Sequence, residues 1–235
     1  MAGSIRLFLP HPLAPGAALP LAPGQAHYLG TVMRRATGER VRVFNGVDGE
    51  WEARVLSLVR NEARLEAARR LRPQAPEPDL WLAFAAVRRE ATEFIVQKAT
   101  ELGVAALLPV LTARTNPGTP NAGRLAAIAT EAAEQCERLT VPAIAPPVRL
   151  TALLAGWPPA RPLFAAIERQ AAPMLRPHAG PAGLLVGPEG GFAPAELDEM
   201  RNHPFVIAAS LGPRVLRAET AAIVGLALLQ APGGG

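Results

Sequence analysis

The strongest constraint on the fold is an alternation of short apolar runs and helical stretches through the last two thirds of the sequence. The runs that predict strands are Leu80–Val87, Ala105–Val110, Leu163–Ile167, Gly183–Gly187 and Phe205–Ala209. The stretches that predict helices are Ala91–Leu102, Gly123–Leu139, Pro194–Asn202 and Ala218–Gln230. Because the runs are almost continuously apolar, they indicate an α/β fold in which a parallel sheet is covered by helices on both faces.

The first third of the chain has a different pattern. Arg40–Phe44 and Glu50–Val59 alternate polar and apolar residues on either side of the turn-forming segment Asn45–Gly49, which predicts a β-hairpin with one buried face. Gln25–Arg35 predicts a short helix with Arg34 and Arg35 at its end. Glu62–Leu71 is compatible with either a helix or a third strand.

Composition divides the chain at the same place. The segment Pro73–Pro78 is rich in proline, which interrupts both helices and central strands. We therefore expect a small, mostly β domain over residues 1–72, a linker over 73–79 and the α/β domain over 80–235. Residues 1–72 contain 11 arginines against 6 acidic residues, a net charge of +5, whereas the rest of the chain has −1. This asymmetry favours a nucleic acid partner for the first domain, although a solvated basic surface is the alternative.

Several classes of protein are disfavoured by the sequence. Cys136 is the only cysteine, so an intrachain disulfide is impossible, and we expect it to be a small, partly buried residue. The four histidines are scattered without ligand spacing, so no metal site is expected. The N-terminus lacks a secretory pattern, and the apolar stretch Ala221–Leu229 is far shorter than the ~20 residues that span a bilayer. We expect a cytoplasmic protein without membrane association.

Two loops stand out because each follows a predicted strand and precedes a predicted helix. They are Gly187–Phe192 and Ser210–Ala221, and ligands of open α/β sheets bind beyond the carboxyl ends of strands. Neither loop matches a nucleotide phosphate-binding motif, and Pro188 and Pro213 remove amide donors. Either loop alone could be a tight turn, but the pair favours a shared site that recognises its ligand through shape and a few backbone contacts.

These segments also resemble a known family, the bacterial 16S ribosomal RNA uridine-N3 methyltransferases of the SPOUT superfamily. The similar segments are Val96–Val104, Glu131–Gln135, Gly187–Phe192 and Leu211–Ala221. The order and spacing of the segments agree with those of the family over almost the whole chain. His27–Arg35 and Gly38–Gly46 resemble the PUA-like RNA-binding module of that family. The chain departs from the family pattern at Cys136-Glu137 and in the loop around Asn116-Pro117.

The resemblance implies a deep trefoil knot in the second domain, S-adenosylmethionine (SAM) as the cofactor, a homodimer, and 16S ribosomal RNA of the small subunit as the substrate. It implies a cofactor site made by Ile167, Gly187, Glu189, Gly190, Gly191, Leu211, Gly212, Val215, Leu216 and Ala218.

Methylation of uridine at N3 requires the loss of a weakly acidic proton. A carboxylate could accept this proton, or a cation could stabilise the resulting anion. Glu189 and Glu219 are candidate bases, although each could instead cap a helix or pair with an arginine. Arg217 is the candidate cation, and it could equally lock its loop by binding carbonyl groups.

The basic side chains that we interpret as RNA contacts are Arg34, Arg35, Arg114 and Arg138. Arg138 lies four residues after Glu134, so a surface ion pair on a helix is its default interpretation. Lys98 and Glu101 share a helical face and are interpreted as structural.

Three alternatives stay open. A related ribose 2′-O-methyltransferase would use the same cofactor loops on another acceptor atom. A non-catalytic RNA-binding protein would have lost its cofactor, but Gly187, Gly190, Gly191 and Gly212 are all present. A nucleotide-dependent oxidoreductase is disfavoured because the dinucleotide-binding motif is missing.

Overall fold

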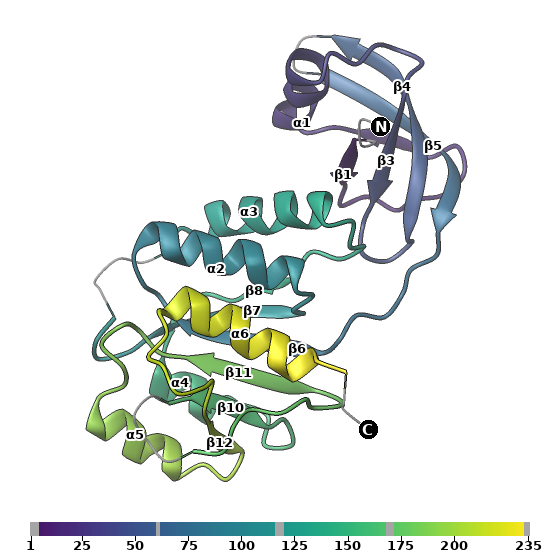
Figure 1. Ribbon diagram of the computed structural model, residues 1–235. Coiled ribbons are helices and arrows are strands. Elements are labelled where there is room, and N and C mark those ends of the chain that lie inside the picture. Colours follow the sequence, from purple (N-terminus) through teal and green to yellow (C-terminus); the bar gives the residue numbers. More distant parts are fainter. Residues whose placement is uncertain (1–4, 60–61, 116–119, 168–171, 233–235) are drawn as a thin grey trace. The chain divides into compact units, whose positions relative to one another are not determined.

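Figure 1 shows the computed structural model, which describes residues 5–59, 62–115, 120–167 and 172–232. These residues form two compact units. The first unit holds Met1–Pro76 together with Ala133–Val141, and the second holds Glu77–Ala132 together with Pro142–Gly235. Asn116 and Pro117 lie outside the described residues.

The first unit is built on a five-stranded mixed sheet with the order β1-β3-β4-β5-β2. The strands are β1 (Arg6–Phe8), β2 (Ala18–Pro20), β3 (Arg40–Phe44), β4 (Glu50–Val59) and β5 (Glu62–Arg72). The predicted hairpin is confirmed as β3 and β4, and the ambiguous segment is the third strand, β5. The inward residues of these strands, such as Val43, Ala53 and Leu65, are fully buried in one core.

The predicted helix of the first unit is confirmed, but its bounds were wrong. Helix α1 covers Pro23–His27 and continues as a π-helical turn, η1, over Tyr28–Val32. Arg34 lies beyond the helix in the left-handed region, at φ 51°. The Ala26 and Leu29 side chains are fully buried, so burial of one face fixes this helix against the sheet.

The second unit contains a seven-stranded sheet, and all its pairs are parallel, as predicted. The order is β12-β10-β11-β6-β7-β8, and β9 also pairs with β7. The strands are β6 (Leu80–Ala85), β7 (Ala106–Leu111), β8 (Ala143–Ile144), β9 (Val148–Arg149), β10 (Leu163–Ala166), β11 (Ala182–Val186) and β12 (Val206–Ala209). The short strands β8 and β9 were not predicted.

Helices cover both faces of this sheet, as Figure 1 shows. They are α2 (Arg89–Glu101), α3 (Ala122–Gln135), α4 (Leu150–Ala155), α5 (Pro194–Arg201) and α6 (Ala218–Gln230). Neighbouring residues of β11 show the two faces. Leu184 packs against α6, where a Cβ on Gly225 would lie 2.6 Å from its Cδ2 atom. Leu185 belongs to the opposite core, with Leu153 of α4 and Met200 of α5.

Two sequence interpretations near the end of α3 are corrected. The helix was expected to reach Leu139, but it ends at Gln135, and Glu137 has a left-handed φ of 62°. Arg138 is therefore not on the helix that carries Glu134. Cys136 lies in the same turn and is exposed rather than partly buried. The Lys98–Glu101 pair is confirmed at 2.8 Å. Across the described ranges, no helix is long and apolar enough to cross a membrane.

Candidate cofactor site

A pocket with a volume of about 470 Å³ lies where β10, β11 and β12 end. Because these strands are parallel, their carboxyl ends meet at one edge of the sheet. Ala166 pairs with both Val186 and Ala209 at that edge. The loops after β11 and β12 extend from it and enclose the pocket. This is the position at which open α/β sheets bind their ligands.

The loop after β11 owes its shape to glycines and one aromatic side chain. The Gly191 amide donates to the Pro188 carbonyl at 2.8 Å, and Gly191 has a φ of +66°, a conformation that favours glycine. The Phe192 ring folds back against Gly187, where an added Cβ would lie 2.9 Å from ring atom Cε2. Any side chain at Gly187 would therefore displace the ring.

The loop after β12 makes its sharpest turn at Gly212, whose φ is +124°. The Gly212 amide donates to Ser210 Oγ at 3.2 Å, which closes a short turn. Leu211 and Leu216 are half-buried on either side of the exposed residues Pro213–Val215. Helix α6 then begins at Ala218, with Arg217 as its N-cap residue.

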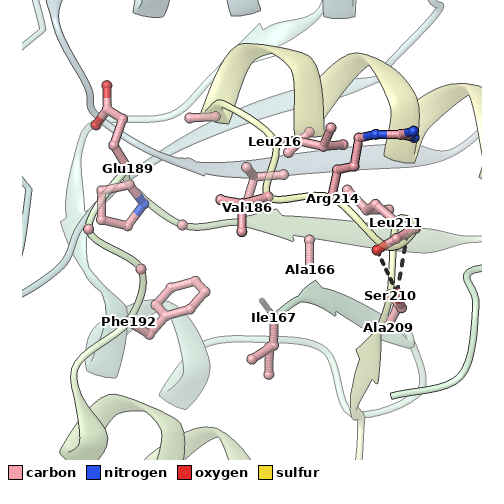
Figure 2. Close-up of a pocket in the computed structure, with 18 of the residues that line it drawn as sticks. Ala166, Ile167, Val186, Glu189, Phe192, Ala209, Ser210, Leu211, Arg214 and Leu216 are labelled. Atoms are coloured by element: carbon pink, nitrogen blue, oxygen red, sulfur yellow. Dashed lines mark hydrogen bonds between the residues drawn. The ribbon is translucent and has the colours of Figure 1, made fainter. Parts of the chain in front are cut away.

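The side chains of the pocket divide into an apolar interior and three charged residues, Arg114, Glu189 and Arg214. Figure 2 shows Ile167 and Phe192 on one side and Val186 and Leu216 on the other. The Glu189 and Arg214 side chains extend in different directions from the two loops. All three charged residues are exposed. The pocket thus offers apolar walls, backbone groups of glycine loops, and opposite charges at its rim.

All ten residues implied as cofactor ligands line this pocket. They are Ile167, Gly187, Glu189, Gly190, Gly191, Leu211, Gly212, Val215, Leu216 and Ala218. Sequence reasoning missed Phe192 and Arg214 as lining residues, although both lie in the singled-out loops. Phe192 could have been found as an aromatic residue directly after paired glycines, whereas the sequence gives no signal that distinguishes Arg214 from an ordinary surface arginine.

The three candidate catalytic residues occupy different positions. Glu189 lines the pocket, but Arg217 and Glu219 do not. Arg217 is exposed. Glu219 is half-buried in the first turn of α6, and its Oε2 atom is buried without a hydrogen-bond partner among the described residues.

The candidate RNA contacts are also dispersed. Arg114 lies at the pocket rim, where its Nη1 donates to the Gly190 carbonyl at 2.6 Å. Arg34 is exposed in the first unit, and Arg35 beside it pairs with Glu39 at 3.3 Å. Arg138 Nη2 donates to Thr140 Oγ1 at 2.9 Å. Within the part of the chain that the structure describes, no cluster of His, Cys, Asp and Glu side chains could hold a metal ion.

Two protein families match the chain. Residues 74–230 match the RNA methyltransferase domain, and residues 21–67 match the RNA methyltransferase PUA domain. These matches agree with the structure, since the first includes the whole pocket and the second lies in the mixed β unit.

Two curated relatives that are similar to nearly the full length of this chain have the same name. Ribosomal RNA small subunit methyltransferase E of Rickettsia conorii is 30% identical over 227 residues, which are 94% of this chain and 93% of that protein. The protein of the same name from a Synechocystis strain is 34% identical over 92% of this chain and 73% of its own length.

Solved structures agree in fold. A Legionella pneumophila protein in complex with bound SAM has a TM-score of 0.89 and 31% identity, and the match covers 100% of both chains. Ribosomal RNA small subunit methyltransferase E from Neisseria gonorrhoeae, also bound to SAM, has a TM-score of 0.86 and 28% identity, and the match covers 96% of both chains. By its family domains, its curated relatives and its fold, the chain belongs to the RNA methyltransferase family that includes the ribosomal RNA small subunit methyltransferases E.

Proposed function

We propose that this protein transfers a methyl group from SAM to N3 of a uridine in 16S ribosomal RNA. The observation that carries the proposal is the pocket between the two glycine loops, on a chain similar over its full length to proteins solved with SAM. The family supplies the substrate class, and the choice of N3 rests on the resemblance of the loop Leu211–Ala221. The trefoil knot remains a prediction from the same resemblance.

The residues of the pocket fit SAM. Its volume is in the range of roughly 300–1,000 Å³ that small-molecule sites occupy. Ile167, Val186 and Leu216 offer apolar surface to a purine ring, and the backbone of the two glycine loops can approach a ligand closely. At the rim, the Glu189 carboxylate suits the cationic part of the cofactor and the Arg214 guanidinium suits its carboxylate. When bound, SAM would supply an electrophilic methyl group.

Residues of this chain must accept the proton that leaves uridine N3 or stabilise the anion that remains. Of the two candidate bases, Glu189 lines the pocket and Glu219 does not. Arg217 is a cation in the second loop, suited to stabilising negative charge that spreads onto the carbonyl oxygens of the base. Glu219 has a buried oxygen that lacks a donor among the described residues, so a donor from outside this chain could complete its hydrogen bonding.

Nucleoside analysis of the RNA product tests the proposal. Small subunits from cells that lack the active protein should gain one methyl group when incubated with the protein and SAM. Mass spectrometry of digested 16S ribosomal RNA should then find the methyl group on the base of a uridine. A methyl group on ribose would support the 2′-O alternative instead, and no transfer would exclude both activities.

We also propose that residues 1–72 act as a PUA-like RNA-binding domain, residues 73–79 as a linker and residues 80–235 as the methyltransferase domain. The support is the excess of arginine in the first segment and the position of the pocket in the last. A substrate in the small ribosomal subunit would place the protein in the cytoplasm.

The salt dependence of RNA binding tests this division. Arg34 is exposed, while the Arg35 side chain is 29% exposed and paired with Glu39, so Arg34 is the better probe of a phosphate contact. Arg34→Ala should weaken binding and reduce the slope of log affinity against log salt by about 0.7–0.9, because one counterion fewer is released. Arg176→Ala, an exposed arginine outside the pocket, is the control. An unchanged slope, or an equal loss of SAM affinity, would contradict the division.

We further propose that the chain forms a homodimer through its methyltransferase domain. The support is the family resemblance, together with exposed apolar side chains on this unit, such as Phe94 and Val215. Helix α6, the expected contact, uses Ala222 and Leu226 in packing within the chain. Its half-buried apolar residues are Ile223, Val224 and Leu228. Sedimentation velocity at micromolar concentration should show a dimer, and a fully active monomer would refute it.

A further inference from the structure

The loop Thr112–Thr115, which follows β7, is attached to the cofactor pocket at two points. Arg114 Nη1 donates to the Gly190 carbonyl at 2.6 Å, and the Ala113 amide donates to Glu196 Oε1 at 2.7 Å. Arg114 and Gly190 both line the pocket. The loop therefore forms part of the pocket wall, although β7 does not adjoin the strands whose ends carry the glycine loops.

Glu196 uses both carboxylate oxygens. Its Oε2 atom accepts a hydrogen bond from the amide of Ala193, the N-cap residue of α5, at 2.8 Å. Capping of a helix by a residue at this position needs only one acceptor, which a glutamine also provides. The Ala113 amide binds the other carboxylate oxygen, and glutamine would place an NH2 group, which cannot accept, at one of these two positions. The second oxygen of Glu196 thus makes a contact beyond the cap of its own helix.

The loop is a closed turn, so the contact at Ala113 is transmitted to its neighbour. The Thr115 amide donates to the Thr112 carbonyl at 3.2 Å, and the Thr112 amide donates to Thr115 Oγ1 at 2.9 Å. Arg114 and its neighbour Ala113 are the exposed residues of this turn. Apart from its bond to Gly190, the Arg114 guanidinium makes no hydrogen bond to any described residue, so its other N–H groups are available to a ligand.

We propose that Glu196 is a positioning residue for the RNA substrate. By holding the Ala113 amide, it fixes the turn so that Arg114 presents its free N–H groups to a backbone phosphate beside the target nucleotide. Planar guanidinium groups suit phosphate recognition when their orientation is fixed in advance. The inference rests on the proposed function, because it assumes an RNA substrate at this rim.

Two variants remove the same hydrogen bond from opposite sides. Glu196→Gln can still cap α5 but can no longer accept from both amides. Ala113→Pro deletes the amide donor and leaves the cap untouched. Ala113 is the second residue of a turn closed by the Thr115 amide, a position at which proline is favoured, so this variant should fold. Glu199→Gln, on the same helix, is the matched control.

A double-mutant cycle with Arg114→Ala decides the matter. With saturating SAM and small subunits as substrate, Arg114→Ala should raise KM for the subunit about 10- to 100-fold, as expected for the loss of one charged hydrogen bond. Glu196→Gln and Ala113→Pro should each raise KM, by a smaller factor, with kcat and SAM affinity almost unchanged. In the Arg114→Ala background, neither substitution should raise KM further.

The outcomes distinguish a failure of the role inferred for Glu196 from a failure of the proposed function. If Glu196→Gln raises KM by the same factor with and without Arg114, Glu196 does not act through Arg114 and the inference is wrong. It is also wrong if both variants lower SAM affinity while KM for the subunit stays constant, or if Glu199→Gln has the same effect. If the wild-type protein methylates no small subunits, the proposed function itself fails.

Discussion

Replacement of Gly212 by alanine is expected to weaken SAM binding about 10- to 100-fold. Gly212 has a φ of +124° and lines the pocket, with open space around the position of a Cβ atom. An L-residue held in such a conformation costs about 1–3 kcal/mol, and a difference of about 1.4 kcal/mol corresponds to a factor of ten in affinity. The loop can relax only by changing its backbone path, which would move Leu211 and Leu216 in the pocket wall. Calorimetry with SAM measures the effect.

Gly180 provides a matched control for backbone strain. It also has a left-handed φ, +98°, with open space around it, but it lies outside the pocket. Gly180→Ala should lower thermal stability about as much as Gly212→Ala and leave SAM affinity unchanged. If the wild type, Gly212→Ala and Gly180→Ala bind SAM with equal affinity, the loop after β12 is not part of the cofactor site. Gly190 is a weaker test, because a Cβ there would meet only the flexible side chain of Arg114, at 3.3 Å.

The second unit was predictable because the local residue patterns of its longer elements agree with the parallel sheet that these elements form together. The five longer strands are apolar runs, and helices α5 and α6 have clear ends, so α6 was predicted residue for residue and α5 to within one residue. The pocket loops were recognisable because glycines and prolines follow strands that must end at one edge of a parallel sheet. Helix α4 was missed because its six residues are too few to show a helical period.

What could not be predicted depends on contacts between distant segments. Nothing in the local sequence indicates that Ala133–Val141 packs with the first unit. The end of α3 depends on Arg6, more than a hundred residues earlier, whose Nη1 donates to the carbonyls of Ala133 and Glu134, both at 2.9 Å. Likewise, the two acceptor contacts of Glu196 appear only when β7 and α5 are brought together.

Replacement of Arg6 by alanine is expected to destabilise the first unit by about 3–5 kcal/mol, the usual loss when one partner of a buried ion pair is removed. The Arg6 and Glu50 side chains are only 3% and 1% exposed, and Arg6 Nε donates to Glu50 Oε1 at 2.6 Å. The guanidinium also lies over the Phe44 ring, 4.5 Å from its centroid. The variant would leave a buried carboxylate whose remaining partners are Arg72, at 2.9 Å, and Arg42, at 3.8 Å.

Hydrogen exchange and urea unfolding at two pH values test this prediction. Burial alone would raise the pKa of Glu50, but hydrogen bonds and charges from Arg6 and Arg72 outweigh burial and hold this pKa below its usual value. In the wild type, this contribution to stability is present above the pKa of an unfolded glutamate, about 4.3, and is lost as pH falls through the lowered pKa. In the variant, Glu50 should bind its proton more tightly, so the difference in unfolding free energy should be largest at neutral pH and shrink in acid.

The exposed pair between Arg40 and Glu52 is the control for this test, with the Arg40 side chain 69% exposed. Arg40→Ala should cost only about 0–1 kcal/mol, because water screens the pair. Amides of β1, β3 and residues 133–141 should exchange faster in Arg6→Ala and not in Arg40→Ala, because Arg6, unlike Arg40, donates to the carbonyls of Ala133, Glu134 and Arg138. Equal losses in the two variants, or a loss independent of pH, would show that the buried pair does not hold the end of α3 to the first unit.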